Sequence, residues 1–194
     1  MTQYENVILI IGLASGTGFI AVLLWSICFP ERRLWPPQIY SNWKSALVWA
    51  GTLGIFVSAI WLGISGWGSA PISPWLRFSL GPILLVLSNL AVWAEAARFG
   101  YAQTSGAPGE LVMSGLYKYS RHPQYVADVA MLIGWFALTA SMPALPVLIA
   151  GVTALLIAPF AEEPWLKEKY GDAYRDYTRQ VPRFLGRPRK VTEQ

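Results

Sequence analysis

The amino-acid sequence predicts an all-α integral membrane protein, and the prediction rests on its composition and on where its charges fall. Of 194 residues, 54% are hydrophobic and only 13% are charged, whereas average proteins carry about 25% charged residues. A bilayer core of roughly 30 Å needs about 20 helical residues. Four uncharged stretches are of this length or longer: Val7–Phe29, Ser45–Leu76, Val129–Ala161 and, the shortest, Phe78–Ala94.

These stretches predict five transmembrane helices. Residues 129–161 are too long for one span and are interrupted by SMPALP at 141–146, where proline favours a turn. This run therefore predicts a tight hairpin of two short helices, the fourth and fifth spans. Residues 45–76 predict one helix followed by an exit loop. The spans are expected at about 7–29, 46–65, 78–97, 125–140 and 144–160.

The basic residues predict the orientation, because Lys and Arg stay on the cytoplasmic side of multi-pass proteins. With five spans and the N-terminus outside, all of the 15 Lys and Arg residues except Arg77 fall on the inner side. The C-terminus is therefore expected to be cytoplasmic. Met1–Asn6 contains no Lys or Arg, so the first span lacks the basic start of a secretory signal and is expected to remain.

The composition also bears on cofactors and partners. Cys28 is the only cysteine, which excludes an internal disulfide, and no metal-ligand spacing is present. The pI near 9.3 comes from the C-terminal tail. A basic tail beside a membrane indicates anionic lipids as partners rather than nucleic acid.

A polar cluster, Arg121–His122–Pro123, directly precedes the fourth span. Proline suits the first position of a helix, and the residue before a proline is pushed out of helical geometry. The fourth span is therefore predicted to begin at Pro123, with Arg121 and His122 at its positive end. Such an end can bind a carboxylate or a phosphate. The alternative is that Arg121 extends to lipid headgroups and that His122 caps the helix.

Asp128 lies a little over one turn inside the fourth span and shares a helical face with Gln124. A carboxylate inside a membrane should face protein or a water-filled cavity. Asp128 is therefore expected either to belong to a site or to make a structural hydrogen bond with Asn89 or Ser88 on the third span.

A second polar cluster follows the fifth span. Glu162 and Glu163 end that span, Pro164 can open a short helix, and Gly171 can end it in a left-handed turn. Two carboxylates at a helix C-terminus need a positive partner, either a ligand or an Arg or Lys of the tail. Beyond them, an amphipathic stripe is expected to lie along the membrane surface or to fold over a site. It consists of Leu166, Tyr170, Tyr174, Tyr177 and Val181.

The predicted hairpin brings both clusters to the same cytoplasmic edge. A ligand that carries a carboxylate and an ammonium would find complementary charges there. Tyr117, Tyr125 and Trp165 could add aromatic faces for a purine or a cation. S-adenosylmethionine has all of these groups, but a phospholipid headgroup is also zwitterionic.

The same residues resemble a known family. The motifs GLYKYSRHPQY and, about forty residues later, AEEPWLKEKYGDAYRDYTRQVPRF resemble integral-membrane methyltransferases of the isoprenylcysteine carboxyl methyltransferase and phospholipid methyltransferase group. The resemblance covers about residues 110–184. It implies a methyltransferase core at 110–186. The three N-terminal spans at 1–109 match the family only as generic apolar segments, and a basic tail follows at 187–194.

The resemblance also implies a cytoplasmic pocket for S-adenosyl-L-methionine and a lipophilic acceptor that enters laterally between helices. The implied cofactor-binding residues are Gly115, Tyr117, Arg121, His122, Pro123, Tyr125, Glu162 and Glu163.

Two residues are expected to act on the acceptor, and the choice depends on its chemistry. Arg183, or Arg179, could orient a carboxylate acceptor through a two-pronged contact. Asp128, or alternatively Glu95 or Glu162, could take the proton from an amine acceptor. The chain departs from the family at Ala127 and at Leu185–Gly186, and Asp128 adds a negative group near the expected methyl path.

Two rival functions stay open. One is an NADPH-dependent membrane reductase resembling the sterol reductases. Against it, Glu162 and Glu163 would repel a 2′-phosphate, and the sequence has no glycine-rich dinucleotide motif. The other is a membrane component without enzymatic activity that binds lipid headgroups through its basic tail.

Overall fold

A computed structural model describes residues 2–36, 42–104 and 109–189 of the chain. Within these ranges, all regular secondary structure is helical, as the sequence predicts. The five long helices are α1 (Gln3–Cys28), α2 (Asn42–Ser65), α3 (Gly81–Thr104), α4 (Pro123–Thr139) and α5 (Leu145–Gln180). Three short turns accompany them: η1 (Pro30–Arg32), η2 (Leu76–Leu80) and η3 (Gly115–Lys118).

Four segments of the described chain are long and apolar enough to cross a membrane. They are Gln3–Cys28, Trp43–Ser65, Leu76–Ala94 and Leu145–Gln180. Helix α4 has 17 residues and is shorter than these four. The structure therefore agrees with a multi-pass membrane protein.

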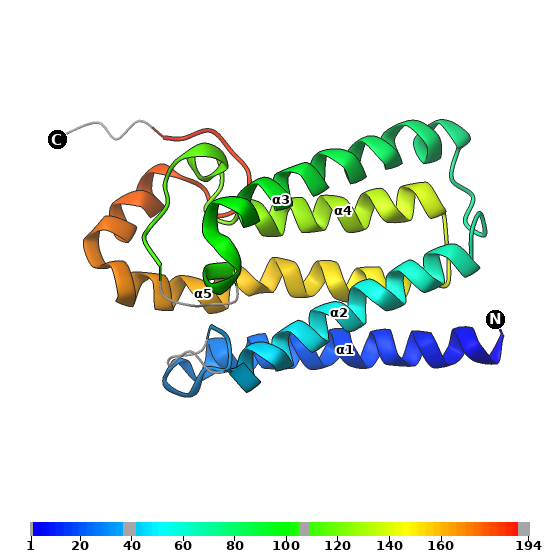
Figure 1. Ribbon diagram of the computed structural model, residues 1–194, viewed down its shortest axis with the longest axis horizontal. Helices are drawn as coiled ribbons and strands as arrows, with labels where there is room; N and C mark the ends of the chain where they lie inside the picture. Colours follow the sequence, from blue (N-terminus) through cyan, green and yellow to red (C-terminus); the bar gives the residue numbers. More distant parts are fainter. Residues whose placement is uncertain (1, 37–41, 105–108, 190–194) are drawn as a thin grey trace.

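The long helices form an elongated bundle with α5 at its centre (Figure 1). Helix α5 packs against α1 on one side and against α4 on the other, while α2 covers α1 and α3 covers α4. Small residues permit the closest approaches. A Cβ atom on Gly12 of α1 would lie 2.7 Å from Cγ2 of Val147 on α5, so only glycine fits this crossing.

The predicted hairpin is present as α4 and α5. Helix α4 ends at Thr139, and Ala140 adopts the left-handed conformation that turns the chain. The turn is anchored to α2, because Ser141 Oγ donates a 2.6 Å hydrogen bond to the carbonyl of Leu62. Helix α5 consequently runs back to the end of the bundle at which α4 begins (Figure 1).

The second helix of the hairpin is longer than predicted. It does not end at Glu162 and Glu163, and Pro164 does not open a new helix, because α5 continues to Gln180. A proline inside a helix removes a backbone hydrogen bond and crowds the preceding turn, and the contacts of both glutamates offset this cost here. The helical conformation is interrupted at Gly171, where φ is 57°. The positive φ expected at this glycine is therefore confirmed.

The amphipathic stripe defined above, which runs across Gly171, packs against Leu111 in a small cluster of its own. The hydroxyl of Tyr170 donates to the carbonyl of Gly109 at 2.6 Å, and that of Tyr177 donates to the carbonyl of Tyr117 at 2.7 Å. The stripe therefore folds over the segment that leads into α4, which was one of its two expected positions.

Candidate functional site

The N-terminus of α4 positions the first polar cluster as the sequence predicts. Pro123 is the first helical residue, and His122 before it has φ −133° and ψ 60°, outside the helical region. The imidazole does not cap the helix, so that alternative is wrong. Instead, the backbone N–H of His122 donates to Ser120 Oγ at 3.1 Å, which leaves the imidazole free to turn toward α5.

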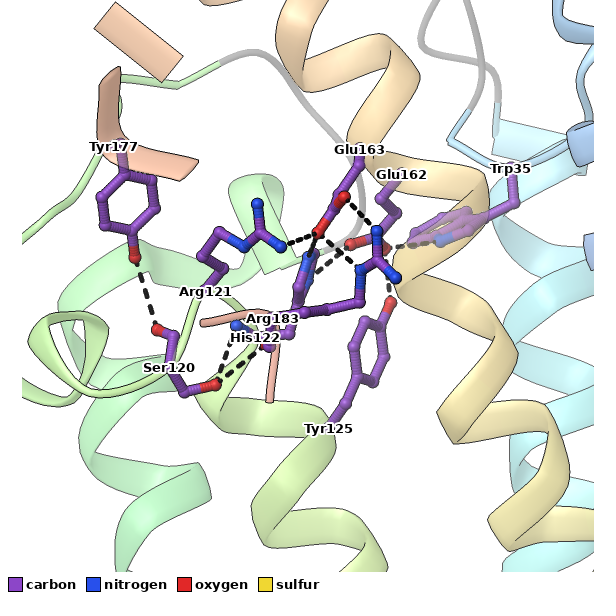
Figure 2. A network of polar contacts seen from close by, with 9 residues as sticks. All are labelled: Trp35, Ser120, Arg121, His122, Tyr125, Glu162, Glu163, Tyr177 and Arg183. Atoms are coloured by element: carbon purple, nitrogen blue, oxygen red, sulfur yellow. Dashed lines mark hydrogen bonds and ion pairs between the residues drawn. The ribbon is translucent and has the colours of Figure 1, made fainter. Parts of the chain in front are cut away.

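Glu163 on α5 lies at the centre of an ion-pair network (Figure 2). Its carboxylate accepts two hydrogen bonds from Arg183, at 2.9 Å from Nε and 2.7 Å from Nη2. Arg121 Nη2 lies 3.1 Å from the same carboxylate. Glu163 is only 3% exposed. The positive partner expected for the glutamate pair therefore includes a tail arginine, and Arg183 also stacks 4.0 Å from the Phe160 ring.

Glu162 points about 100° away from Glu163 around α5 and shares only His122 with it as a partner among the described residues. Its Oε1 atom accepts a 2.8 Å hydrogen bond from Trp35 Nε1 and another from the Tyr125 hydroxyl. Its Oε2 atom lies 3.5 Å from His122 Nδ1. Three donors, one from the segment after α1 and two from the start of α4, therefore converge on this carboxylate (Figure 2).

His122 lies between the two glutamates and is 5% exposed. Its Nε2 atom is 3.6 Å from Glu163 Oε1. Burial opposes the charged imidazole, but the adjacent carboxylates of Glu162 and Glu163 outweigh it and hold the pKa of His122 above its usual 6.5. Folding therefore favours the cationic form of His122 relative to the unfolded chain.

This raised pKa predicts a stability effect that depends on pH. A group with a raised pKa in the folded state stabilises fully below its unfolded pKa, and the stabilisation is lost as the pH rises through the folded value. We expect the wild type to exceed His122→Gln in thermal stability most below about pH 6.5, with the difference shrinking at higher pH. Thermal unfolding of both proteins across this range measures it, and a difference that is constant or grows with pH would contradict the assignment.

A cavity of about 380 Å³ opens beside this network. Its polar end includes Tyr117, Arg121, His122, Tyr125 and Glu162. Its apolar part is formed by side chains from the other helices: Phe19 of α1, Val48, Trp49, Leu53 and Phe56 of α2, Val92 of α3 and Leu155 of α5. One cavity thus joins a charged end to an apolar chamber within the bundle.

Buried polar atoms without partners also belong to this cavity. Across the described residues, the buried side-chain atoms that lack a hydrogen-bond partner are Arg121 Nε, His122 Nε2 and the Tyr174 hydroxyl. All three residues line the cavity. Unsatisfied buried polar groups are uncommon in folded proteins, so their presence here favours a ligand site.

The other predicted site residues lie behind the cavity wall or away from it. Gly115 has φ 66° and starts η3, and Pro123 is buried as the first residue of α4. Glu163 and Arg183 are not among the residues that line the cavity, and they support the wall through their mutual ion pair. Arg179 is paired with Asp176 at 3.1 Å on the exposed surface.

Asp128 lines the cavity one turn of α4 beyond Tyr125. The structural hydrogen bond proposed for it is absent, because Ser88 donates to the carbonyls of Leu84 and Leu85 and Asn89 donates to Leu85. None of the described side chains donates a hydrogen bond to Asp128. The side chain of Glu95, the alternative base, lies outside the described residues.

Trp35 is the residue of the site that sequence reasoning missed. Its side chain is buried at 7% exposure and donates a hydrogen bond to Glu162, 127 positions away. Trp67 and Trp75, in contrast, are exposed, as is typical of tryptophans at a membrane interface. No local pattern distinguishes Trp35 from these tryptophans, so its role depends on the tertiary fold.

The fold and the site define a helical, multi-pass membrane protein with a polar-ended cavity at one end of its bundle. Residues 76–173 match the phospholipid methyltransferase family. The matched segment is half of the chain and includes α4, most of α5 and the polar clusters. The chain belongs to this family. No solved structure matches it.

Individual proteins with similar sequences share 24–27% identity with this chain, and their names describe different functions. The Steroid 5-alpha-reductase DET2 of Solanum lycopersicum is 24% identical over 57% of this chain and 43% of its own length. The Nickel-cobalt-cadmium resistance protein NccN of Alcaligenes xylosoxydans is 26% identical over 72% of this chain and 63% of its own. The Cobalt-zinc-cadmium resistance protein CzcN of Cupriavidus metallidurans is 27% identical, with 72% and 62% covered. The chain thus spans less than two thirds of each relative's length.

Proposed function

We propose that this protein is an S-adenosyl-L-methionine-dependent methyltransferase that acts on a lipophilic acceptor at the cytoplasmic face of a membrane. The observation that carries the proposal is the single cavity in which a charged, aromatic end continues into an apolar chamber. Membership of the phospholipid methyltransferase family supports it.

The residues of the polar end fit the chemical groups of S-adenosylmethionine. Glu162 offers a carboxylate to the ammonium, while Arg121 and His122 place positive charge beside the carboxylate, and Arg121 Nε has no hydrogen-bond partner. Tyr117 and Trp165 also line the cavity and offer aromatic faces to the adenine or the sulfonium. Gly115, Pro123 and Glu163 hold these residues in position from behind.

The chain's own contribution to methyl transfer is positioning and exclusion of water. The bound cofactor supplies a methyl group on a sulfonium, which is already activated. Residues of the polar end fix the methyl donor, and the apolar chamber holds the acceptor. Because the reacting atoms are then held in line and nearly in contact, positioning supplies much of the rate acceleration. Burial of the Glu163 network keeps this wall of the cavity rigid.

The proposal includes a topology of five spans. Helix α4 is the fourth of the five spans despite its 17 residues, because it pairs with α5 and the basic residues then fall on one side. The N-terminus is outside, and the site and C-terminus are cytoplasmic, where the basic tail meets anionic lipids. The core comprises residues 110–186, preceded by three spans at 1–109 and followed by a tail at 187–194, of which 190–194 lie outside the described residues.

The alternative is a membrane reductase that uses NADPH, which the likeness to a steroid 5-alpha-reductase favours. The sequence suggested that both Glu162 and Glu163 would repel the 2′-phosphate of NADPH. In the structure Glu163 contributes little to this repulsion, because Arg121 and Arg183 balance its charge. Glu110, Asp128 and Glu162, among the described residues that line the cavity, still carry carboxyl groups that oppose a phosphate there. A lipid-binding protein without enzymatic activity is the third possibility.

Ligand binding to the purified wild-type protein in lipid nanodiscs tests the proposal. We expect saturable binding of radiolabelled S-adenosylmethionine, competed by S-adenosylhomocysteine and not by NADPH. Binding of NADPH in its place would establish the reductase. Binding of neither cofactor would contradict both enzymatic functions and leave the lipid-binding protein.

A further inference from the structure

Asp128 is a carboxylate of the cavity to which the proposed binding of a methyl donor assigns no role. It lies on the cavity wall, six residues along α4 from His122, which corresponds to about 9 Å of helix rise. Phe56 and Leu53 of α2 and Leu155 of α5 also line this cavity. None of the described side chains forms an ion pair or hydrogen bond with Asp128, which makes it a carboxylate facing an apolar chamber.

The cationic side chains that line the cavity lie at its polar end, next to the start of α4. Arg121 and His122 are the cationic side chains among the described residues that line it, and both precede α4. Both also already face the glutamates of α5. A carboxylate or phosphate brought beside Asp128 would therefore meet a like charge in a poorly solvated place, and like-charge juxtaposition is costly there.

We infer that Asp128 selects the methyl acceptor: a nucleophile with an N–H or O–H group, carried directly on an apolar body and with no anionic group beside it. The inference rests on the proposed function. A buried carboxylate gains a charge-assisted hydrogen bond from such a donor. Carboxylate acceptors and amines next to a phosphate are both disfavoured, because each places an anion near Asp128.

The transfer step balances with Asp128 as the proton acceptor. A lone pair on the acceptor nitrogen or oxygen forms the new bond to the methyl carbon. The carbon–sulfur bond breaks, and its electron pair remains on sulfur as a neutral thioether. The acceptor proton passes to the Asp128 carboxylate and then to water. No oxidant or reductant is involved.

Four acceptor probes and one isosteric variant test the inference on the full chain in nanodiscs. Transfer of a radiolabelled methyl group is measured to dodecylamine and 4-dodecylphenol, which carry the donor, and to dodecanoate and phosphatidylethanolamine, which carry an anion. We expect at least one probe of the first pair to exceed both of the second by about 10-fold or more. In Asp128→Asn, transfer to the preferred probe should fall about 100-fold, while dodecanoate becomes relatively better. Asp176→Asn, on the exposed surface, is the matched control.

The pattern separates selection from a merely structural role, which would lower transfer to every probe equally. Preference for dodecanoate or phosphatidylethanolamine in the wild type, transfer to none of the probes, or an unchanged preference in Asp128→Asn would overturn the inference. Binding of S-adenosylmethionine is measured on the same samples. If the wild type does not bind S-adenosylmethionine, the proposed function itself is refuted. If only Asp128→Asn fails to bind it, the preference of the wild type among the four probes decides whether the inference holds.

Discussion

Replacing Glu163 with alanine is expected to lower the free energy of unfolding by about 3–5 kcal/mol, because it removes one partner of a buried ion network. The carboxylate is 3% exposed and is shared by Arg121, Arg183 and His122. The Arg121 side chain is 11% exposed and cannot regain its hydration without opening the site. The variant therefore leaves cations buried without an anion.

Unfolding of the purified protein in mixed micelles, followed by denaturation curves, measures this loss. Asp176→Ala on the same helix is the control, because Asp176 and Arg179 form an ion pair with side chains 61% and 72% exposed. Removal of such a surface pair costs about 0–1 kcal/mol. Adding Arg183→Ala to Glu163→Ala should recover part of the loss. Equal destabilisation by Glu163→Ala and Asp176→Ala would show that the network is not a structural centre.

The meeting of the two polar clusters could be predicted from the sequence, because it follows from chain connectivity. An uncharged run too long for one span, with prolines at its middle, returns the chain to the side from which it came. His122 and Glu162 therefore had to lie at the same end of the bundle, and 3.5 Å separates them. The length of the uncharged run and the positions of its prolines were enough for this prediction, because both depend only on residues that are neighbours in the sequence.

The division of roles between Glu162 and Glu163 could not be predicted in the same way. Adjacent residues on a helix point about 100° apart, so one glutamate faces Arg183 and the other faces Trp35 and the cavity. Which of them faces which depends on how α5 is rotated against α1 and α4. That rotation is set by contacts such as Gly12 with Val147, which no local pattern reveals. The continuation of α5 past Pro164 has a similar cause, since tertiary contacts override a local signal.

This division predicts that Glu162→Gln weakens binding of S-adenosylmethionine by about 10- to 100-fold while the fold is preserved. Glutamine keeps an oxygen that can accept from Trp35 Nε1 and the Tyr125 hydroxyl. It removes the negative charge that the proposed function assigns to the ammonium of the cofactor. His122→Ala should weaken binding as well, because it removes a cationic side chain from the wall of the cavity.

Equilibrium binding to both variants measures the effect, with Glu168→Gln as the control. Glu168 pairs with Arg33 at 3.2 Å, but its side chain is 71% exposed and it does not line the cavity, so its variant should bind as the wild type does. A cofactor analogue without the α-amino group identifies the contact, because it should bind the wild type and Glu162→Gln with the same affinity. If Glu162→Gln weakens both ligands equally, the carboxylate acts by shaping the cavity and not by pairing with the ammonium.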